Sequence, residues 1–254
     1  MKGIDMSGKI YKPKGKAQEY AESTPGANDG YAVNLYKGCP HRCKYCYVPL
    51  LPPWKFLDNP REAFHATCKP FPDVLKKLGS SCKSMVKRGL ENNPLHLCFT
   101  CDPYPTGVDT TVTRKALQML GDYGFGNVQV LTKGREATRD FDLYNHGYGW
   151  RFGVSMIGYN LIALDLMQAH QAGIRTWASI EPVLLPRAAL NTIRWTMDYT
   201  YHYKIGKLNH GAQISPELGE IEANTDWAKF VRDVKTLLPP ERYMLKDSLK
   251  QYEG

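Results

Sequence analysis

Residues 38–47 read Gly-Cys-Pro-His-Arg-Cys-Lys-Tyr-Cys-Tyr, which spaces Cys39, Cys43 and Cys46 as Cys-x-x-x-Cys-x-x-Cys and puts Tyr47 directly after the last cysteine. The preceding residues 32–36, Ala-Val-Asn-Leu-Tyr, predict a short strand that leads into this loop. Thiolates ligate iron–sulfur clusters, and a cubane cluster has four irons. Three cysteines can hold three of them, which leaves the fourth open to the amino and carboxylate groups of a small molecule such as S-adenosylmethionine.

Two other roles for the three thiols are conceivable. A structural zinc site needs four ligands, usually as paired Cys-x-x-Cys units. His41 is the one nearby candidate for a fourth ligand, but it lies between its would-be partners in a tight loop. A disulfide framework is typical of small secreted domains, which a chain of 254 residues is not. The spacing therefore favours the cluster.

The composition is that of a globular protein, with 43% hydrophobic and 23% charged residues among 254. No apolar run approaches the ~18 residues of a membrane span. The N-terminus lacks the apolar segment of a signal peptide, so seven cysteines predict a reducing, cytoplasmic location. The net charge of +8 favours an anionic partner, nucleic acid above all, although a merely solvated surface explains it equally well.

From residue 31 onward, strand-like apolar runs alternate with helical patterns, as in parallel βαβ units. The predicted strands are 32–36, 95–101, 128–133, 151–156, 175–181, 201–208 and 242–247. The predicted helices are 72–88, 111–123, 135–144, 160–172, 187–196 and 226–237. We predict one α/β domain over residues 29–254, a partial or complete parallel (β/α) barrel of six to seven units. Residues 1–28 are predicted to form a basic, irregular N-terminal arm over the barrel.

In such a barrel the site lies at the carboxyl ends of the strands. Polar or ionisable residues stand at these ends in six predicted strands, including Asp102, Lys133, Ser155 and Glu181. A solvated rim would also be polar there, but the repetition across strands favours a site.

Further blocks make the sequence resemble the spore photoproduct lyase-like branch of the radical S-adenosylmethionine superfamily. They are Asn-Leu-Tyr-Lys-Gly at 34–38 before the cysteines, Thr-Cys-Asp-Pro-Tyr at 100–104, Val-Leu-Thr-Lys at 130–133, Thr-Arg-Asp at 138–140 and Phe-Gly-Val-Ser at 152–155. The resemblance covers about residues 31–182. The cysteine block is specific for the superfamily, and the other blocks are moderately specific for the branch.

The resemblance implies a radical enzyme of a lyase, isomerase or base-modifying type. It implies a [4Fe–4S] cluster on Cys39, Cys43 and Cys46, with S-adenosylmethionine on the fourth iron. An electron from a low-potential donor such as flavodoxin or ferredoxin would cleave S-adenosylmethionine to a 5′-deoxyadenosyl radical, which takes hydrogen from the substrate.

By the same resemblance, Lys133 and Ser155 hold the methionine end of S-adenosylmethionine, since an ammonium and a hydroxyl suit a carboxylate. Tyr47 matches the aromatic residue between the cluster and adenine. Cys101 and Asp102 match a turn that contacts the cofactor. Glu181 is predicted to bind ribose hydroxyls or the substrate, with an ion pair at the barrel rim as the alternative.

One departure from the lyase concerns hydrogen return. The lyase uses a cysteine at the position of Phe99 to return hydrogen to the product radical. Cys101 is the candidate replacement here, with an inert buried thiol as the alternative. Side chains alternate along a strand, so an extended segment 95–101 would put Cys98 and Cys101 on opposite faces.

Three hypotheses about function remain. The first is radical chemistry on a pyrimidine base of nucleic acid or on a nucleotide, in repair or hypermodification. The second is the same chemistry on a small metabolite or peptide, although no second cysteine cluster of the kind common in peptide-modifying relatives is present. The third is a non-enzymatic zinc-binding or nucleic-acid-binding module. The sequence makes no prediction about oligomeric state.

Overall fold

The computed structural model describes residues 8–22, 27–146, 149–208 and 210–253. Its main sheet has seven strands in the order β1-β4-β5-β6-β7-β8-β9, and every neighbouring pair is parallel. The strands are β1 (Tyr31–Val33), β4 (Leu95–Leu97), β5 (Val128–Thr132), β6 (Arg151–Ser155), β7 (Arg175–Ile180), β8 (His202–Ile205) and β9 (Tyr243–Leu245). A small antiparallel pair, β2 (Tyr36–Lys37) with β3 (Lys69–Pro70), stands apart.

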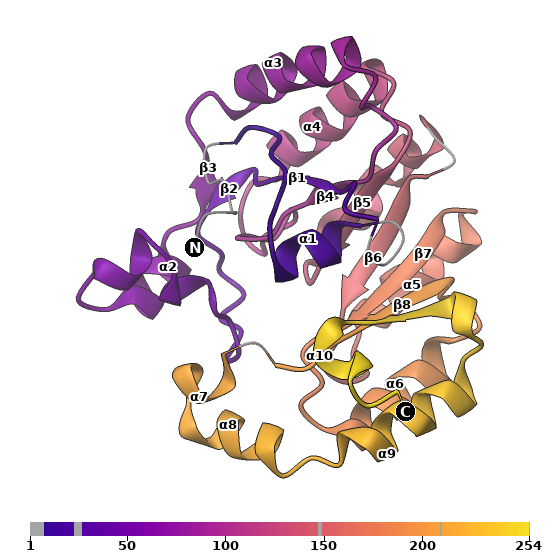
Figure 1. Cartoon of the computed structure of the whole chain (residues 1–254). Coiled ribbons are helices and arrows are strands. Elements are labelled where there is room, and N and C mark those ends of the chain that lie inside the picture. Colours follow the sequence, from indigo (N-terminus) through magenta and orange to yellow (C-terminus); the bar gives the residue numbers. More distant parts are fainter. Residues whose placement is uncertain (1–7, 23–26, 147–148, 209, 254) are drawn as a thin grey trace.

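Helices follow the strands and cover the outer face of the curled sheet, which forms a half-barrel (Figure 1). The covering elements are α3 (Val74–Lys87), α4 (Thr111–Asp122), the 3₁₀ segment η3 (Arg135–His146), α5 (Ile162–Gln171), α6 (Pro186–Thr196) and α9 (Trp227–Leu237). The shorter elements are α1 (Lys16–Ala21), η1 (Val48–Leu50), η2 (Trp54–Phe56), α2 (Pro60–Ala66), α7 (Gly211–Ile214), α8 (Pro216–Ala223), η4 (Pro240–Arg242) and α10 (Asp247–Lys250).

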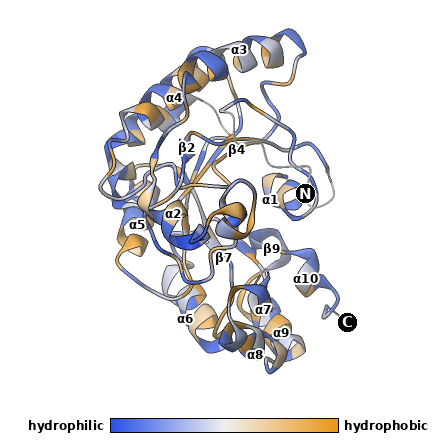
Figure 2. Ribbon diagram, turned by 90° about the vertical axis from the view of Figure 1, so that its left-hand side faces the viewer, coloured by the Kyte–Doolittle hydropathy of each residue, from blue (hydrophilic) through white to orange (hydrophobic). Residues whose placement is uncertain are grey.

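Local sequence explains the covering helices. In α3 the buried residues Val74, Leu78, Cys82 and Met85 recur every three or four positions, which places them on one face. Figure 2 shows the resulting mixture of hydrophilic and hydrophobic residues along α3 and α4. A helix with one apolar stripe packs that stripe against the sheet and leaves its polar face in solvent.

The prediction of a partial parallel β/α barrel is confirmed, because the described strands run from β1 to β9 without closing on each other. All seven predicted strands are present. The segment 95–101 is shorter than predicted, since β4 ends at Leu97. No described helix is long and apolar enough to cross a lipid bilayer.

The N-terminal segment was predicted to be irregular, and for residues 16–21 this is wrong because α1 forms there. Residues 1–7 and 23–26 of the predicted arm lie outside the described residues. Helix α1 bonds to the inner side of the half-barrel: Lys204 Nζ of β8 donates to the Tyr20 carbonyl, and Lys246 Nζ donates to the Lys16 carbonyl over 3.3 Å. The Tyr20 ring contacts the rings of His96 and Trp177. These buried contacts stabilise α1, whose local sequence alone does not predict a helix.

Lys204 is a buried cation among these contacts, and burial lowers its pKa from 10.5 to about 7. At a pH between these two pKa values, Lys204 is therefore protonated more often in the unfolded chain than in the folded chain. The contribution of Lys204 to stability must accordingly rise with pH across this window. We expect this contribution to appear between pH 7 and pH 9 as a difference in the urea midpoint of unfolding from a variant that lacks the lysine.

The substitution Lys204→Met removes this titration and serves as the comparison. The two histidines whose pKa Lys204 lowers, His96 and His202, have an ordinary pKa of 6.5, which is below this window. We expect the difference in midpoint between the two proteins to change with pH in favour of the native chain. Parallel pH profiles of the two proteins would contradict this prediction.

Candidate active site

A cavity of about 780 Å³ opens at the carboxyl ends of the strands. This volume lies within the range of sites that enclose small-molecule ligands. The segments that line it are the cysteine loop, the turn after β4, the ends of β5, β6 and β7, and the start of α1. All nine residues predicted for the site line it: Cys39, Cys43, Cys46, Tyr47, Cys101, Asp102, Lys133, Ser155 and Glu181.

The cysteine loop passes against the backbone of the segment that contains α2. Gly38 has φ +83°, and a Cβ atom there would lie 1.3 Å from the Thr67 carbonyl oxygen, so only glycine fits before Cys39. The Cys39 amide donates to the Phe64 carbonyl over 3.2 Å, and His65 Nδ1 lies 2.8 Å from the Cys39 carbonyl. The loop therefore begins in a fixed position.

Arg61 of α2 fixes the other two cysteines. Its guanidinium donates to the Cys43 carbonyl over 3.1 Å and to the Cys46 carbonyl over 3.3 Å. Helix α2 begins with an Asn59 side chain that accepts from the Glu62 amide and with Pro60 in the first turn, a typical helix start. Sequence analysis missed α2, although this capping signal was there to find.

The three cysteines fit a cluster by the chemistry of their donors. All are free thiols facing the same cavity. Burial raises the pKa of Cys39 and raises that of Cys46 to about 11, so both are neutral until a metal displaces the proton. Among the described residues no three His, Cys, Asp or Glu side chains form a group for one metal ion. A cubane cluster differs from a single ion, because each thiolate binds a separate iron.

Asp102 joins the cysteine loop to the barrel. Its carboxylate accepts from the Tyr104 amide over 2.8 Å, the Thr132 hydroxyl over 2.5 Å and the Lys133 amide over 2.8 Å. His41 Nε2 lies 3.2 Å from Asp102 Oδ2, the oxygen that also accepts from the Lys133 amide. Burial alone would raise the pKa of Asp102, but His41, Thr132 and the Lys133 amide together lower it. The carboxylate thus holds the loop and the end of β5 in register.

Lys133 and Ser155, predicted to share one role, lie side by side. Lys133 Nζ donates to Ser155 Oγ over 2.6 Å, and the ammonium lies 5.7 Å from the Tyr45 ring centre. Parallel strands β5 and β6 bring them together, because their carboxyl ends meet at one edge of the sheet. A cation and a hydroxyl here form a ready site for a carboxylate.

Glu181 follows β7 and lines the cavity. Its Oε1 lies 3.2 Å from Lys246 Nζ, and both side chains are nearly buried, at 13% and 5% exposed. Lys246 in turn lies 4.9 Å from the Tyr20 ring centre. The ion pair and the predicted cavity position of Glu181 are therefore both present.

The expectation that Cys98 and Cys101 face opposite sides is wrong. The chain leaves the strand at Leu97, and the Asn34 side-chain oxygen accepts from the amides of Phe99 over 2.7 Å and Thr100 over 3.0 Å. This turn directs both thiols into the cavity. Burial and a hydrogen bond with Cys98 raise the pKa of Cys101 well above its ordinary value, so it stays a neutral thiol.

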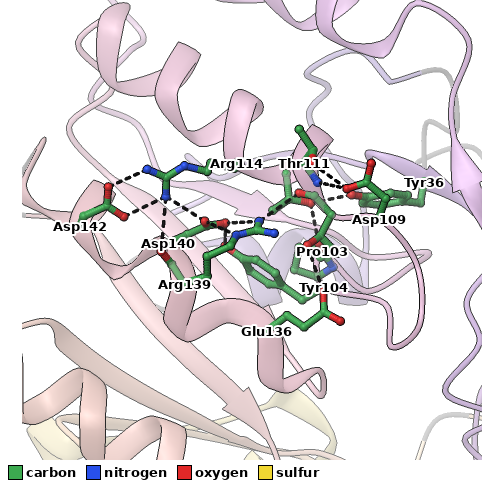
Figure 3. A network of polar contacts seen from close by, with 12 residues as sticks. Tyr36, Pro103, Tyr104, Asp109, Thr111, Arg114, Glu136, Arg139, Asp140 and Asp142 are labelled. Atoms are coloured by element: carbon green, nitrogen blue, oxygen red, sulfur yellow. Dashed lines mark hydrogen bonds and ion pairs between the residues drawn. The ribbon is translucent and has the colours of Figure 1, made fainter.

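The turn between Asp102 and β5 is also held from outside the cavity (Figure 3). Asp140 is fully buried and accepts from the Tyr104 hydroxyl over 3.0 Å, from Arg114 over 2.9 Å and from Arg139 over 2.8 Å. Thr113 donates to the Pro103 carbonyl over 2.5 Å. Tyr104 therefore anchors the turn that carries Asp102.

Sequence analysis missed the cavity residues of the N-terminal segment, Lys14, Lys16 and Tyr20. Lys246, in contrast, stands at the end of the predicted strand 242–247, where polar residues favoured a site. The run of lysines at 12, 14 and 16 was the available signal, but it gave no indication that this segment enters the barrel.

No protein-family model matches the chain. It is 24% identical over 197 residues to an uncharacterized protein of Methanocaldococcus jannaschii, with 70% of each chain covered. A double variant of spore photoproduct lyase with bound AdoMet and dinucleoside spore photoproduct has a TM-score of 0.64 and 14% identity, covering 96% of this chain and 80% of its own. A further variant of that lyase has a TM-score of 0.65 at 12% identity over the same shares. The chain thus has the fold of spore photoproduct lyase.

Proposed function

We propose that this protein is a radical S-adenosylmethionine enzyme that acts on a pyrimidine base of nucleic acid or on a nucleotide. The observation that carries the proposal is the meeting of Cys39, Cys43 and Cys46 with Lys133 and Ser155 around one cavity. The common fold with a lyase solved with AdoMet and a dinucleoside supports it.

Each residue has a proposed task in this chemistry. Cys39, Cys43 and Cys46 bind the cluster, while Lys133 and Ser155 bind the carboxylate of the methionine end. Tyr47 packs against the adenine, and Glu181 accepts from ribose hydroxyls. When bound, the cluster and S-adenosylmethionine supply a 5′-deoxyadenosyl radical by reductive cleavage of the sulfonium. Asp102 positions the cysteine loop and the end of β5 rather than contacting S-adenosylmethionine, since its oxygens already accept hydrogen bonds from the protein.

The charges around the cavity support an anionic substrate. Among the residues that the structure describes, four lysines line it, Lys14, Lys16, Lys133 and Lys246, against the carboxylates of Asp102 and Glu181. Glu181 is paired with Lys246, and Lys133 is assigned to the cofactor. Lys14 and Lys16 of the N-terminal segment are then the candidates for contact with a phosphate.

Cys101 is the proposed hydrogen donor to the substrate radical. Its raised pKa keeps the S–H bond intact, as hydrogen-atom donation requires. Phe99 stands where the lyase carries its hydrogen-returning cysteine. This difference favours modification of a base over repair of the spore photoproduct.

The deciding experiment is anaerobic turnover of the reconstituted protein with S-adenosylmethionine and dithionite. We expect a thymidine-containing oligonucleotide to raise the rate of 5′-deoxyadenosine formation and to change in mass. A purine-only oligonucleotide of the same length is the matched control, and thymidine with and without its 5′-phosphate tests the role of the phosphate.

Equal rates of 5′-deoxyadenosine formation with the pyrimidine, the purine and no oligonucleotide would contradict a nucleic-acid substrate. Stimulation by a small metabolite or peptide instead would transfer the same chemistry to that class. A colourless protein that binds one zinc would contradict the radical enzyme altogether.

A further inference from the structure

The cysteine loop faces the cavity and also packs against a small separate core. This core consists of Val48, Leu51, Trp54 and Phe64, of which all but Trp54 also line the cavity. Cys39, Cys46 and Tyr47 pack directly against this core. The segment that carries it, from η1 to α2, projects from the body of the molecule (Figure 1). The core therefore connects η2, through Trp54, with Cys39 and Cys46.

The outer surface of η2 exposes large apolar side chains. Phe56 is 74% exposed and the next residue, Leu57, is 46% exposed, whereas Trp54 in the same turn is 3% exposed. Trp54 makes an edge contact with Phe64, with ring centres 5.2 Å apart. One short helix thus presents Phe56 to solvent and, through Trp54, contacts the core beneath the cysteines. Two adjacent exposed apolar side chains form a small patch that a partner can cover.

Basic residues surround this apolar pair. Lys55 Nζ lies 4.7 Å from the Phe56 ring centre, and Lys37 Nζ lies 5.4 Å from the Trp54 ring centre. Both lysines are exposed. Residues 37–69 contain six lysines and arginines against two acidic residues, a formal charge of +4. One of the two acids, Glu62, is paired with Arg42 over 2.7 Å. The other acid, Asp58, is exposed next to Leu57. The surface is therefore apolar at its centre and has a net positive charge at its rim.

We propose that Lys37, Lys55, Phe56 and Leu57, here called the Phe56 patch, form the docking surface for an acidic electron-transfer protein. The inference rests on the proposed function, which requires one electron from outside for each cleavage. In the docked complex a flavin hydroquinone of the donor loses one electron and becomes the semiquinone. The cluster gains that electron, and no bond of this chain forms or breaks.

Charge and position favour this partner over nucleic acid. An acidic carrier complements the cationic rim, and charge complementarity of this kind steers weak, fast association. The lysines assigned to substrate, Lys14 and Lys16, belong to the N-terminal segment that lines the cavity. The Phe56 patch does not line the cavity, so a docked donor leaves room for the substrate.

The test measures binding and electron transfer separately. Reconstituted native protein and the variants Phe56→Ser and Lys55→Glu are titrated with a purified flavodoxin by calorimetry at low and high salt. Both side chains are exposed, so neither substitution removes a core contact. Leu161→Ser is the matched control, because Leu161 is 67% exposed and lies at the start of α5, outside the patch.

We expect each patch variant to weaken flavodoxin binding by about tenfold, as for a central interface residue, and the control to bind as the native protein does. The effect of Lys55→Glu should shrink at high salt, and that of Phe56→Ser should not. Flavodoxin-driven formation of 5′-deoxyadenosine should fall in parallel, while dithionite-driven formation stays unchanged.

Unchanged flavodoxin binding in both patch variants would overturn the proposal. So would weakened binding of an oligonucleotide with unchanged binding of flavodoxin, which would assign the patch to nucleic acid. A native protein that binds flavodoxin through the patch but forms no 5′-deoxyadenosine with any reductant would support the docking surface and contradict the proposed function.

Discussion

The substitution Cys46→Ala is expected to abolish both bound iron and S-adenosylmethionine cleavage. Cys46 is one of three thiols that face one cavity, and its backbone is held by Arg61. Loss of an outer partner of a metal ligand typically costs 10–100-fold in affinity or activity. Loss of one of only three ligands should exceed this range, because no other cysteine lies on the loop to replace it.

Iron and sulfide analysis after anaerobic reconstitution measures this effect, together with 5′-deoxyadenosine formation under dithionite. Cys82→Ala is the control: Cys82 is a fully buried thiol on α3 and packs in the main core away from the cavity. It should retain iron and turnover. Full iron content and native turnover in Cys46→Ala would refute the assignment of the three ligands.

The substitution Asp140→Ala should have the largest effect on stability. Asp140 is fully buried and accepts from Arg114, Arg139 and the Tyr104 hydroxyl (Figure 3). Arg114 and Arg139 are 30% and 43% exposed, so water can take over part of their charge and the cost stays below that of a fully buried ion pair. The main loss is the buried acceptor of the Tyr104 hydroxyl, about 1–3 kcal/mol of the free energy of unfolding. Tyr104 thereby loses its anchor, so the turn that carries Asp102 should loosen.

Urea denaturation of the two proteins measures the difference in the free energy of unfolding. Asp142→Ala is the matched control, since Asp142 pairs with the same Arg114 over 2.7 Å but is 56% exposed. Exposed pairs contribute little, so the control should lose several-fold less stability than Asp140→Ala. Equal losses in the two variants would show that burial of Asp140 is not what makes the network important.

The strands and outer helices could be predicted because each carries its own periodic signal. The core strand β5 is a short apolar run, and α3 repeats apolar residues every third or fourth position. The predicted end positions of Lys133 and Ser155 then met in space because parallel strands must align their carboxyl ends. This part of the site followed from the topology alone.

The N-terminal segment and the turn after β4 could not be predicted because distant residues determine them. Helix α1 depends on Lys204 and Lys246, about 180 and 230 residues away. The course of Cys98 and Cys101 depends on the Asn34 side chain, which accepts hydrogen bonds from two amides of the turn after β4. The sequence pattern of one segment does not identify partners that lie far away in the chain.

The position of α1 has a consequence for synthesis of the protein. The ribosome releases residues 16–21 early, but the lysines that bind their carbonyls, Lys204 and Lys246, emerge much later. The inner side of the half-barrel therefore lacks the full contacts of α1 until β9 has been translated. Prematurely terminated chains that lack β9 would therefore contain all three cysteines and yet lack a complete wall around them.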